Sequence, residues 1–394
     1  MSRTQKLKGL SAASLRLKTL NDNPYTVEMK TKARVIAFYL PQFHPIPEND
    51  ETWGKGFTEW INVAKAKPLF PGHYQPRIPA DLGFYDLRLP QVREAQADLA
   101  RDAGVEGFMY WHYWFGNGKM LLEKPLEEVV DSGEPDFPFC YGWANHSWST
   151  KTWTNNGRVP ENKIIAEQLY LGHGDNVAHF NYCLKAFKDK RYITVEGKPL
   201  FVIFDAPSFI GMKDFIDDWQ KLAKQNGLPG IYFVGQWTTL TPLDDFWKQG
   251  FDGVICSGRQ IAEKRASGGS LLRKVRDFLS YKFGLPTMIF EYSKIMKYME
   301  FEENRLTNCF PKIIPGYDRT ARAGFKGQIY KNATPKAFAE NIERTLTYIM
   351  DKDYEHRLIF LDSWNEWGEG NYMEPDQKWG HAFLNALKSK IIEK

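Results

Sequence analysis

Eight short runs rich in β-branched and aromatic residues recur from residue 34 onward, and amphipathic segments separate most of them. The runs cover residues 35–40, 105–111, 138–143, 199–204, 230–235, 252–257, 312–317 and 357–362. Intervening segments such as QVREAQADLARDAG and AFAENIERTLTYIM have the apolar spacing of helices that bury one face. This alternation favours a parallel sheet built from βα units. Eight units predict an α/β fold, a (β/α)8 TIM barrel, in preference to a doubly wound open sheet.

The length of 394 residues fits one barrel with long loops as well as two average domains. We predict a basic N-terminal tail at residues 1–33 and a barrel catalytic domain at residues 34–394. Residues 41–87 and 258–311 are predicted as long βα-loop insertions on the catalytic face.

The second insertion contains the basic stretch SLLRKVRDFLSYKFG. Its apolar residues repeat at helical spacing, namely Leu271, Leu272, Val275, Phe278, Leu279 and Phe283. This spacing predicts a lid or capping helix packed on the barrel. The alternative, based on its Lys and Arg residues, is contact with an anionic polymer or peripheral contact with a membrane surface.

Charge and cysteine content narrow the class of protein. The net charge of +4 is small and dispersed, and no nucleic-acid-binding motif occurs, so we expect no nucleic-acid partner. No run approaches the roughly 18 apolar residues of a membrane span, so no transmembrane segment is expected. The four cysteines are widely separated and suit a reducing compartment. Together with the lack of a secretory signal, this predicts a cytoplasmic protein.

Polar and aromatic residues gather where most of the predicted strands end. In a parallel barrel the carboxyl ends of the strands carry the loops that build the active site. We therefore predict that these strand ends form one substrate site. Its predicted substrate-binding residues are Gln42, His44, Trp111, His112, Tyr113, Trp114, Trp143, Asn145, His146, Gln236, Trp237, Tyr317, Asp318, Arg319, Trp364, Asn365 and Trp367.

Two carboxylates lie three residues apart in DSWNEWGEGNYMEP, directly after the eighth predicted strand. Like charges at this spacing repel when the segment turns helically. At about 5 Å and an effective dielectric of about 20, the repulsion is roughly 3 kcal/mol, or about two pKa units. One glutamate would then hold a proton near neutral pH while the other stays ionised. Glycosidic-bond cleavage uses this division, so Glu366 and Glu369 are the predicted catalytic residues.

The aromatic content supports a sugar site over other chemistries. Aromatic residues make up 15% of the chain, and many fall in polar stretches beside the predicted strand ends. Aromatic rings cover the apolar faces of sugars, while amides, carboxylates and histidines orient the hydroxyl groups. Common signatures of nucleotide-triphosphate, zinc-protease and esterase sites are absent. The histidines are scattered, so we expect neither a metal nor another cofactor, and we predict a poly- or oligosaccharide substrate.

Three stretches carry a family resemblance. FYLPQFHPIPENDETWGKGFTEWINVAKAKPLFPGHYQPRIPADLGFYDLR, AGVEGFMYWHYWF and DSWNEWGEGNYMEP resemble the WbsX-type glycosyltransferases of surface-polysaccharide and lipopolysaccharide (O-antigen) synthesis. The resemblance spans about residues 34–390. The barrel of that family is similar to glycoside hydrolase family 99, the endo-α-mannosidases, to which this chain is linked by the Glu-Trp-x-Glu-Gly stretch.

The resemblance to the hydrolase implies a role for each glutamate. Glu366 would help the 2-hydroxyl of the substrate attack the anomeric carbon, which gives a 1,2-anhydro sugar. Glu369 would act first as general acid and then as general base, with overall retention. Gly368 is a departure, because the hydrolase motif has a histidine at this position.

Three functions remain open at this point. The chemistry favours a retaining glycoside hydrolase acting on an α-linked polysaccharide. The family label and the expected cytoplasmic location favour a glycosyltransferase that builds cell-surface polysaccharide. A non-catalytic carbohydrate-binding barrel is the third alternative, which the presence of both glutamates disfavours.

Overall fold

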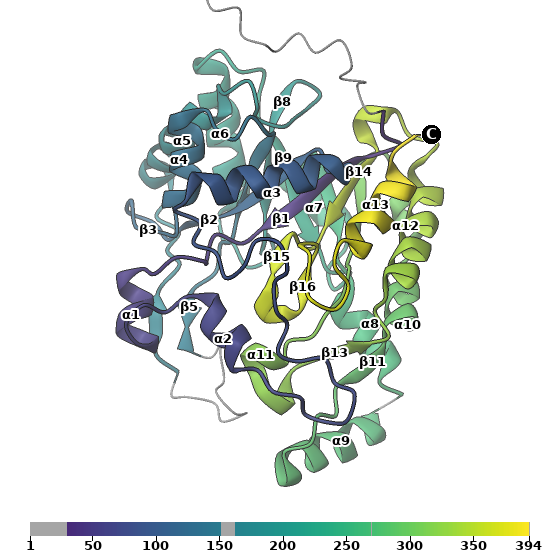
Figure 1. The fold of residues 1–394 in the computed structure, drawn as a ribbon. Coiled ribbons are helices and arrows are strands. Elements are labelled where there is room, and N and C mark those ends of the chain that lie inside the picture. The colour runs from purple at the N-terminus through teal and green to yellow at the C-terminus, as the bar shows by residue number, and fades with distance from the viewer. Residues whose placement is uncertain (1–29, 151–161, 269, 394) are drawn as a thin grey trace, which may run out of the picture.

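The computed structural model describes residues 30–150, 162–268 and 270–393, and within these ranges eight parallel strands close into a barrel (Figure 1). The strands are β1 (Arg34–Tyr39), β2 (Gly107–Trp114), β4 (Phe139–Trp143), β8 (Lys198–Ile203), β9 (Tyr232–Trp237), β10 (Gly253–Cys256), β12 (Cys309–Ile313) and β14 (Leu358–Leu361). Each pairs with its neighbours in chain order. Ile36 of β1 lies opposite both Phe360 of β14 and Gly107 of β2, which closes the ring. The predicted (β/α)8 barrel is confirmed.

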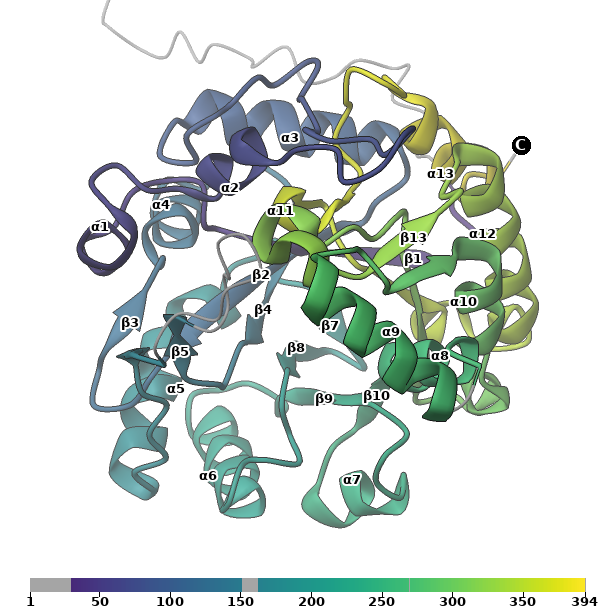
Figure 2. The same cartoon turned by 90° about the horizontal axis from the view of Figure 1, so that it is seen from below.

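Helices surround the barrel, as Figure 2 shows from the face that carries the long loops. They are α3 (Pro90–Asp102), α4 (Lys124–Ser132), α5 (His173–Phe187), α6 (Met212–Gln225), α7 (Asp244–Gln249), α10 (Tyr292–Tyr298), α12 (Pro335–Ile349) and α13 (Ala382–Ile391). Local sequence explains their limits. At α12, for example, Thr334 accepts a hydrogen bond from the backbone N–H of Ala337, and Pro335 occupies the first helical position.

The interior of the barrel is filled by side chains. The ring of Phe360 lies 5.9 Å from that of Phe38 and 6.1 Å from that of Phe310. A Cβ on Gly142 would lie 2.6 Å from Cε of Met109, so the glycine leaves the space that this methionine fills. At the carboxyl ends of the strands the side chains leave a cavity, which opens toward the βα loops.

Short elements shape these loops. The minor strands are β3 (Met120–Leu121) against β2, β5 (Trp148–Ser149) against β6 (Ile164–Ala166), β7 (Thr194–Val195) against β8, β11 (Ile289–Glu291) against β13 (Ile329–Lys331), and β15 (Asn365–Glu366) against β16 (Asn371–Tyr372). The short helices are α1 (Pro47–Trp53), α2 (Glu59–Lys65), α8 (Arg259–Ala266) and α11 (Thr320–Ala323), with 3₁₀ turns η3 (Glu302–Arg305), η4 (Gly324–Lys326), η5 (Tyr354–His356) and η6 (Trp367–Glu369).

The insertion at residues 41–87 lies against the segment that follows β14. The backbone N–H of Ala80 donates to the carbonyl of Pro375 at 2.9 Å, and that of Gln377 donates to Ile78 at 2.9 Å. Helix α2 lies beside α11 on the loop-bearing face (Figure 2). The insertion is therefore part of the wall around the cavity rather than a separate domain.

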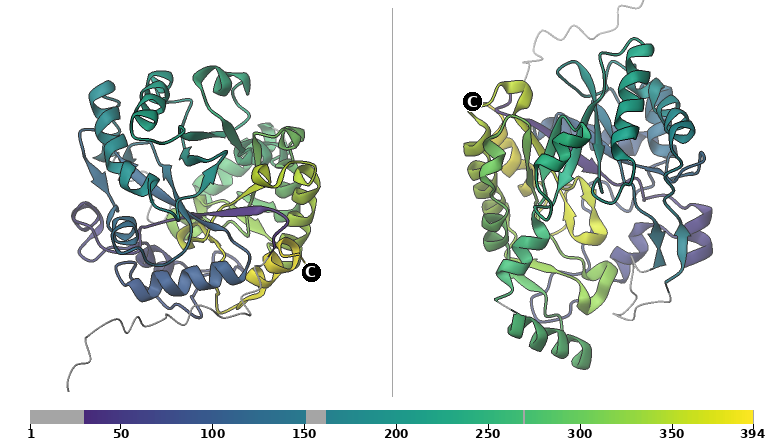
Figure 3. Two further views of the ribbon diagram at one scale, coloured as in Figure 1. Left: turned by 90° about the horizontal axis from the view of Figure 1, so that it is seen from above. Right: turned by 180° about the vertical axis from the view of Figure 1, so that it is seen from behind.

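Helix α9 (Ser270–Phe283) stands out from the same end of the molecule (Figure 3). The prediction that its apolar side chains pack on the barrel is wrong for three of them, because Val275, Phe278 and Phe283 are 49–58% exposed. Leu279 is half-buried, and the side chains of Leu271 and Leu272 lie outside the described part of the chain.

Most of the predicted basic tail, residues 1–29, also lies outside the described residues. Residues 30–33 belong to the folded body. The N–H of Lys32 donates to the carbonyl of Ile391 at 2.8 Å, and Ala33 is fully buried. Within the described ranges, no helix combines the length and the apolar character needed to cross a membrane. All four cysteines are buried and unpaired.

Candidate active site

A cavity of about 570 Å³ lies at the carboxyl ends of the barrel strands, where the sequence places the site. Nine of the predicted residues line it, namely Gln42, Trp111, Tyr113, His146, Gln236, Tyr317, Arg319, Glu366 and Glu369. They come from β2 and β9 themselves and from the segments after β1, β4, β12 and β14, so residues far apart in the sequence meet at one place. Its volume is that of a small-molecule or oligosaccharide site.

The segment after β14 folds back as a small hairpin that presents both glutamates to the cavity. Glu366 ends β15 opposite Asn371 of β16, and η6 turns the chain between them. Gly370 follows at φ +56°, a conformation that glycine adopts without strain. A Cβ there would also lie 2.8 Å from Cβ of Asp318. The tight turn therefore keeps Glu366 and Glu369 on the same side of the hairpin.

A single guanidinium group holds the pair. Arg322, in α11, donates from Nη2 to Oε2 of Glu366 at 2.8 Å and from Nη1 to Oε1 of Glu369 at 2.8 Å. Its Nε donates to Oε1 of Glu59 at 2.9 Å, and Nη2 donates to Oε2 of the same carboxylate at 3.1 Å. The side chains of Arg322 and Glu59 are 8% and 0% exposed. Three carboxyl groups thus share one buried cation.

This environment shifts the pKa values of Glu366 and Glu369 in opposite directions. Burial, together with repulsion from Glu369 and Glu59, raises the pKa of Glu366 to about 8, although Arg322 opposes the rise. Burial also acts against ionisation of Glu369, but Arg322, Arg259 and Arg319 outweigh it and lower the pKa of Glu369. The predicted separation of their pKa values is present. Burial acts to raise both pKa values, so the separation comes from Arg259 and Arg319 acting on Glu369, whereas the sequence argument relied on mutual repulsion.

Gly368 has a steric reason in this arrangement. A Cβ at this position would overlap Oε1 of Glu59 and lie 2.9 Å from Nε of Arg322. The glycine therefore lets the buried ion pair approach the backbone of η6. Position 368 is where the hydrolase motif has a histidine. Here Glu59 and Arg322 fill the space that such a side chain would need.

Ten predicted substrate-binding residues do not line the cavity, and the structure corrects their direct role. They are His44, His112, Trp114, Trp143, Asn145, Trp237, Asp318, Trp364, Asn365 and Trp367. All ten are buried. In β2 the reason is the alternation of a strand, because Trp111 and Tyr113 face the cavity while His112 and Trp114 face the other side. Sequence position at a strand end does not reveal which side a residue faces.

Several of these buried residues hold the loops instead. The amide of Asn365 donates to the carbonyl of Leu40 at 3.0 Å and accepts from its N–H at 2.7 Å. The amide of Asn145 bonds the backbone of Asp205 in the same two-way manner. Such pairs fix the spacing between loops of different strands. They position the cavity walls without contacting the cavity.

Trp367 lies behind the glutamates. Its ring stacks on Tyr372 at 3.7 Å, and its Nε1 donates to Oε2 of Glu374 at 2.6 Å. Glu374 also accepts from Tyr85 and Gln96, and burial raises its pKa to about 7. This buried network fixes the turn that carries Glu366 and Glu369.

Asp318 also helps to fix the turn that carries Glu366 and Glu369. It accepts a hydrogen bond from Gln75 and pairs with His73 at 2.8 Å and with Arg77 at 3.5 Å. Despite its burial, these partners lower its pKa to about 2. The N–H of Asp318 donates to the carbonyl of Glu369 at 2.6 Å. Asp318 therefore connects the 41–87 insertion to the catalytic candidates.

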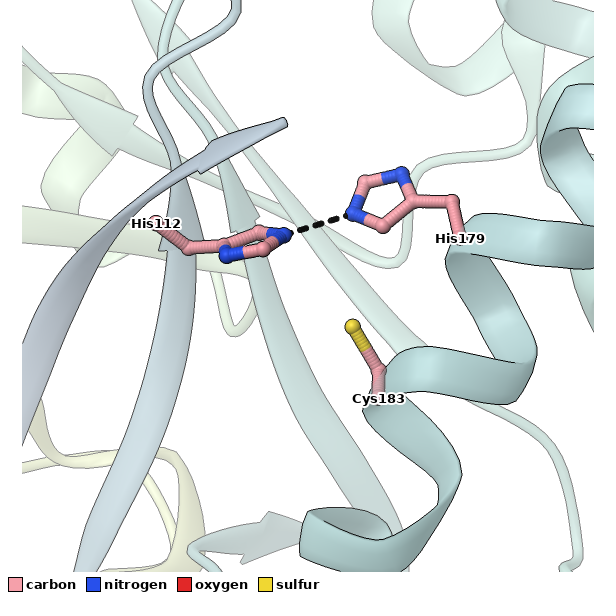
Figure 4. A group of neighbouring side chains, drawn as sticks. All are labelled: His112, His179 and Cys183. Atoms are coloured by element: carbon pink, nitrogen blue, oxygen red, sulfur yellow. Dashed lines mark hydrogen bonds between the residues drawn. The ribbon is translucent and has the colours of Figure 1, made fainter. Parts of the chain in front are cut away.

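His112 belongs to a buried group of possible metal ligands with His179 and Cys183, both on α5 (Figure 4). Their ligand atoms lie within 4.8 Å of one another, and two histidines with a cysteine are donors that zinc or copper accepts. Here Nε2 of His112 and Nε2 of His179 share a hydrogen bond of 2.9 Å. Burial lowers both pKa values, that of His112 to about 3. Trp114 stacks on His179 at 4.7 Å. We assign these histidines a packing role.

Sequence reasoning missed residues that define the site, above all Glu59 and Arg322. Glu59 lies in the motif GFTEWINV between aromatic residues, and Arg322 follows Arg319 by three residues after the seventh strand. Both signals are visible, but neither indicates that the side chains meet across 263 residues. Arg259 and the ion pair between Lys312 and Asp362, at 2.9 Å, also line the cavity.

The fold and the site together define a class: a (β/α)8 barrel with a half-buried carboxyl pair at the carboxyl ends of its strands. The family model described as "Glycosyltransferase WbsX" matches residues 35–387. The chain therefore belongs to the WbsX glycosyltransferase family.

The chain is also similar to two curated proteins. Two proteins, both named "Uncharacterized protein WxcX" and from two strains of Xanthomonas campestris pv. campestris, are 33% identical over 362 residues. The match covers 91% of this chain and 50% of each relative, so the chain spans half the length of these relatives.

The fold is similar to that of the GH99 endo-alpha-mannosidase from Bacteroides thetaiotaomicron, at 15% identity and a TM-score of 0.53, covering 90% of this chain and 95% of that one. A structure described as a glycoside hydrolase-like protein gives a TM-score of 0.57 at 13% identity, covering 93% and 96%. The family match gives the family of the chain, and the solved structures show that the barrel fold is shared.

The close approach at Gly368 gives a first testable prediction. Gly368→Ala is expected to displace the Glu59–Arg322 pair and to lower the free energy of unfolding by about 1–3 kcal/mol, as overpacking of a buried site does. Chemical denaturation of the purified variant measures this. Gly174→Ala is the matched control, because no atom lies within 4 Å of a Cβ there. Equal stability of the two variants would contradict the steric role of Gly368.

The raised pKa of Glu366 gives a second prediction. Between the ordinary value of 4.5 and about 8, the folded protein holds a proton that the unfolded chain has released. The free energy of unfolding therefore falls as pH rises through this window. Glu366→Gln removes that loss, so the variant should gain at least about 1 kcal/mol over wild type between pH 5 and pH 8.

Urea unfolding at several pH values measures this effect. Part of the wild-type slope should remain in Glu366→Gln, because Glu374 also has a raised pKa, of about 7. Glu343→Gln is the control, since the ion pair with Lys390 lowers the pKa of Glu343 and places its titration below this window. A slope unchanged in Glu366→Gln would show that Glu366 is ionised across the range.

Proposed function

We propose that the protein acts on a glycosidic bond, as a retaining glycoside hydrolase on an α-linked polysaccharide, with Glu366 and Glu369 as its catalytic residues. The observation that supports this most is the half-buried carboxyl pair on Arg322, whose pKa values move in opposite directions. At neutral pH the pair holds one proton. One proton donor beside one ionised carboxylate is the arrangement that glycoside cleavage requires.

The cavity wall suits a sugar. Trp111, Tyr113 and Phe204 give it aromatic surface, which can cover the C–H faces of a pyranose ring. Gln42 and Gln236 are 4% and 5% exposed, and each has an amide nitrogen without a hydrogen-bond partner in the described part of the protein. A buried unpaired donor is costly, and sugar hydroxyl groups would satisfy both.

The proposed reaction follows the resemblance to the hydrolase family. An ionised glutamate takes the proton of the 2-hydroxyl, and the 2-oxygen forms a bond to the anomeric carbon. The bond to the leaving oxygen breaks, and that oxygen takes the proton of the other glutamate. Water then opens the 1,2-anhydro ring. Its oxygen bonds to the anomeric carbon as the bond from that carbon to the 2-oxygen breaks. The water proton passes to the glutamate that acted as acid, and the 2-oxygen takes back its proton from the glutamate that acted as base. Two inversions give retention.

The roles implied by the resemblance make Glu366 the base and Glu369 the acid. The charges around the free site favour the opposite distribution of the single proton. Glu369 faces Arg319 and Arg259 as well as Arg322, so it is the carboxyl that ionises first. Both assignments require the same total charge on the pair, and they differ only in the oxygen that holds the proton.

A glycosyltransferase is the second candidate, and the family description supports it. It would use the same cavity with a sugar hydroxyl in place of water as acceptor. The match covers half of each curated relative. A non-catalytic binding barrel is disfavoured, since it has no need of a half-buried, partly protonated pair.

The third prediction concerns the reaction. Incubation of wild type with activated α-glycosides is expected to release sugar, and Glu366→Gln and Glu369→Gln should each lose at least about 100-fold in rate. Proton NMR of the first product should show retention. Consumption of a nucleotide sugar only in the presence of an acceptor would favour the transferase instead. Variants as active as wild type would refute the assigned site.

Leaving-group dependence separates the two role assignments. A variant without the general acid should still cleave aryl glycosides with good leaving groups, because these depart without a proton. A variant without the base should lose activity on all substrates. Retained aryl-glycoside activity in Glu369→Gln would support the roles implied by the resemblance, and in Glu366→Gln the reverse.

We also propose that α9 makes peripheral contact with an anionic membrane surface. Its exposed Val275 and Phe278 lie on a helix that also carries exposed Lys274 and Lys282. The ammonium group of Lys282 lies 5.4 Å from the ring of Phe278. Exposed aromatic residues flanked by lysines suit the boundary between lipid headgroups and acyl chains.

The fourth prediction tests this contact by sedimentation with vesicles. Wild type should sediment with vesicles containing phosphatidylglycerol and not with vesicles of phosphatidylcholine alone. Phe278→Asp should abolish sedimentation. Ile210→Asp, which replaces a 91% exposed residue elsewhere, should not. Equal behaviour of both variants, or no dependence on anionic lipid, would refute the contact.

A further inference from the structure

Arg259 occupies an unusual place in the cavity wall. It is the first residue of α8, directly after the end of β10, and it lines the cavity. Its guanidinium carbon lies 4.2 Å from the centre of the Tyr317 ring. Within the described residues no carboxylate lies within 4.0 Å of this guanidinium. An aromatic face fixes the group in place without neutralising its charge.

The carboxyl groups whose charges act on Arg259 are bound by other groups. Glu369 accepts a hydrogen bond from Arg322 at 2.8 Å and lies 3.5 Å from Nε of Arg319. Asp362, which also lines the cavity, is paired with Lys312 at 2.9 Å. Arg259 is therefore a cation of the cavity wall whose neighbouring carboxylates are held by other cations.

The backbone adds to this charge. Helix α8 begins at the cavity, has no acidic residue in its first turn and has no side-chain cap. Its N-terminal N–H groups carry the positive end of the helix dipole. A neutral sugar does not call for two guanidinium groups and a helix N-terminus on one wall, whereas a carboxylate or phosphate binds to such groups in a bidentate manner.

We propose that Arg259, with Arg319 beside it, forms an anion subsite that binds a carboxylate or phosphate group carried by the substrate. This rests on the proposed function and narrows its substrate class to acidic glycans or phosphorylated sugars. A uronic acid in the polysaccharide would supply the carboxylate. A sugar phosphate or nucleotide sugar would supply the phosphate.

The simpler role for Arg259 is to keep Glu369 ionised. That role would affect catalysis on every substrate equally and would not distinguish acidic from neutral ligands. The anion subsite instead predicts a loss confined to ligands that carry the charge. The two roles therefore differ in selectivity, and selectivity is what the experiment measures.

The test measures binding in the Glu366→Gln background, which prevents turnover. Titration calorimetry compares methyl glycosides of mannose, glucose and galactose with the matching uronic acids, and adds glucose 1-phosphate and UDP-glucose. We expect at least one anionic probe to bind about 10-fold or more tighter than its neutral counterpart. Arg259→Gln should reduce this ratio to about one, while Arg259→Lys should retain part of it.

Arg265→Gln is the matched control, because Arg265 is exposed on the same helix, and the ratio should not change there. Preference for uronic acids identifies a carboxylate, and preference for the phosphorylated probes identifies a phosphate.

Three results would each overturn the subsite: equal binding of neutral and anionic probes, no binding of any anionic probe, or an equal loss for all probes in Arg259→Gln. Cleavage of neutral glycosides without anion preference would refute only the subsite, whereas anion binding without turnover of any glycoside would refute only the proposed function.

Discussion

The buried guanidinium of Arg322 is the interaction on which the arrangement of the site depends. Three carboxyl groups from two distant parts of the chain, Glu59 on one side and Glu366 with Glu369 on the other, converge on it. Burying so many charges is costly unless each is paired and hydrogen-bonded. Every nitrogen of the guanidinium donates to a carboxylate, so the cost is offset by geometry. The same geometry explains why position 368 is glycine.

Three sets of side-chain contacts connect the 41–87 insertion to the residues that surround Glu366 and Glu369. Glu59 reaches Arg322, and His73 with Arg77 reaches Asp318, while Tyr85 donates to Glu374. Each contact joins a buried charged group to a partner far away in sequence. With these contacts in place, the side chains of Glu366 and Glu369 are 13% and 20% exposed, so water screens their charges less than on an open loop.

Sequence patterns predict the fold well because burial of eight apolar strands is a repeated, local signal. The eight predicted runs all correspond to barrel strands, and Glu366 and Glu369 lie in the cavity as predicted. The predictions failed for residues whose role depends on the direction in which the side chain points. Trp364 and Trp367 are predicted substrate-binding residues, but both are buried outside the cavity lining, and His112 faces α5 rather than the cavity. The charged partners Glu59 and Arg322 could not be predicted, because pairing across 263 residues leaves no local periodicity.

The pKa values of the two glutamates depend on charged groups from several loops of this face. Repulsion from Glu59 raises the pKa of Glu366, whereas Arg259 and Arg319 stabilise the charge on Glu369. The first influence comes from the insertion after β1, and the second from the loops after β10 and β12. Both act in the same sense, because each favours one proton placed on Glu366 over one placed on Glu369. An anionic group bound beside Arg259 would offset the guanidinium charge and weaken this preference. Substrate binding would then move the shared proton toward Glu369, the position that the roles implied by the resemblance require.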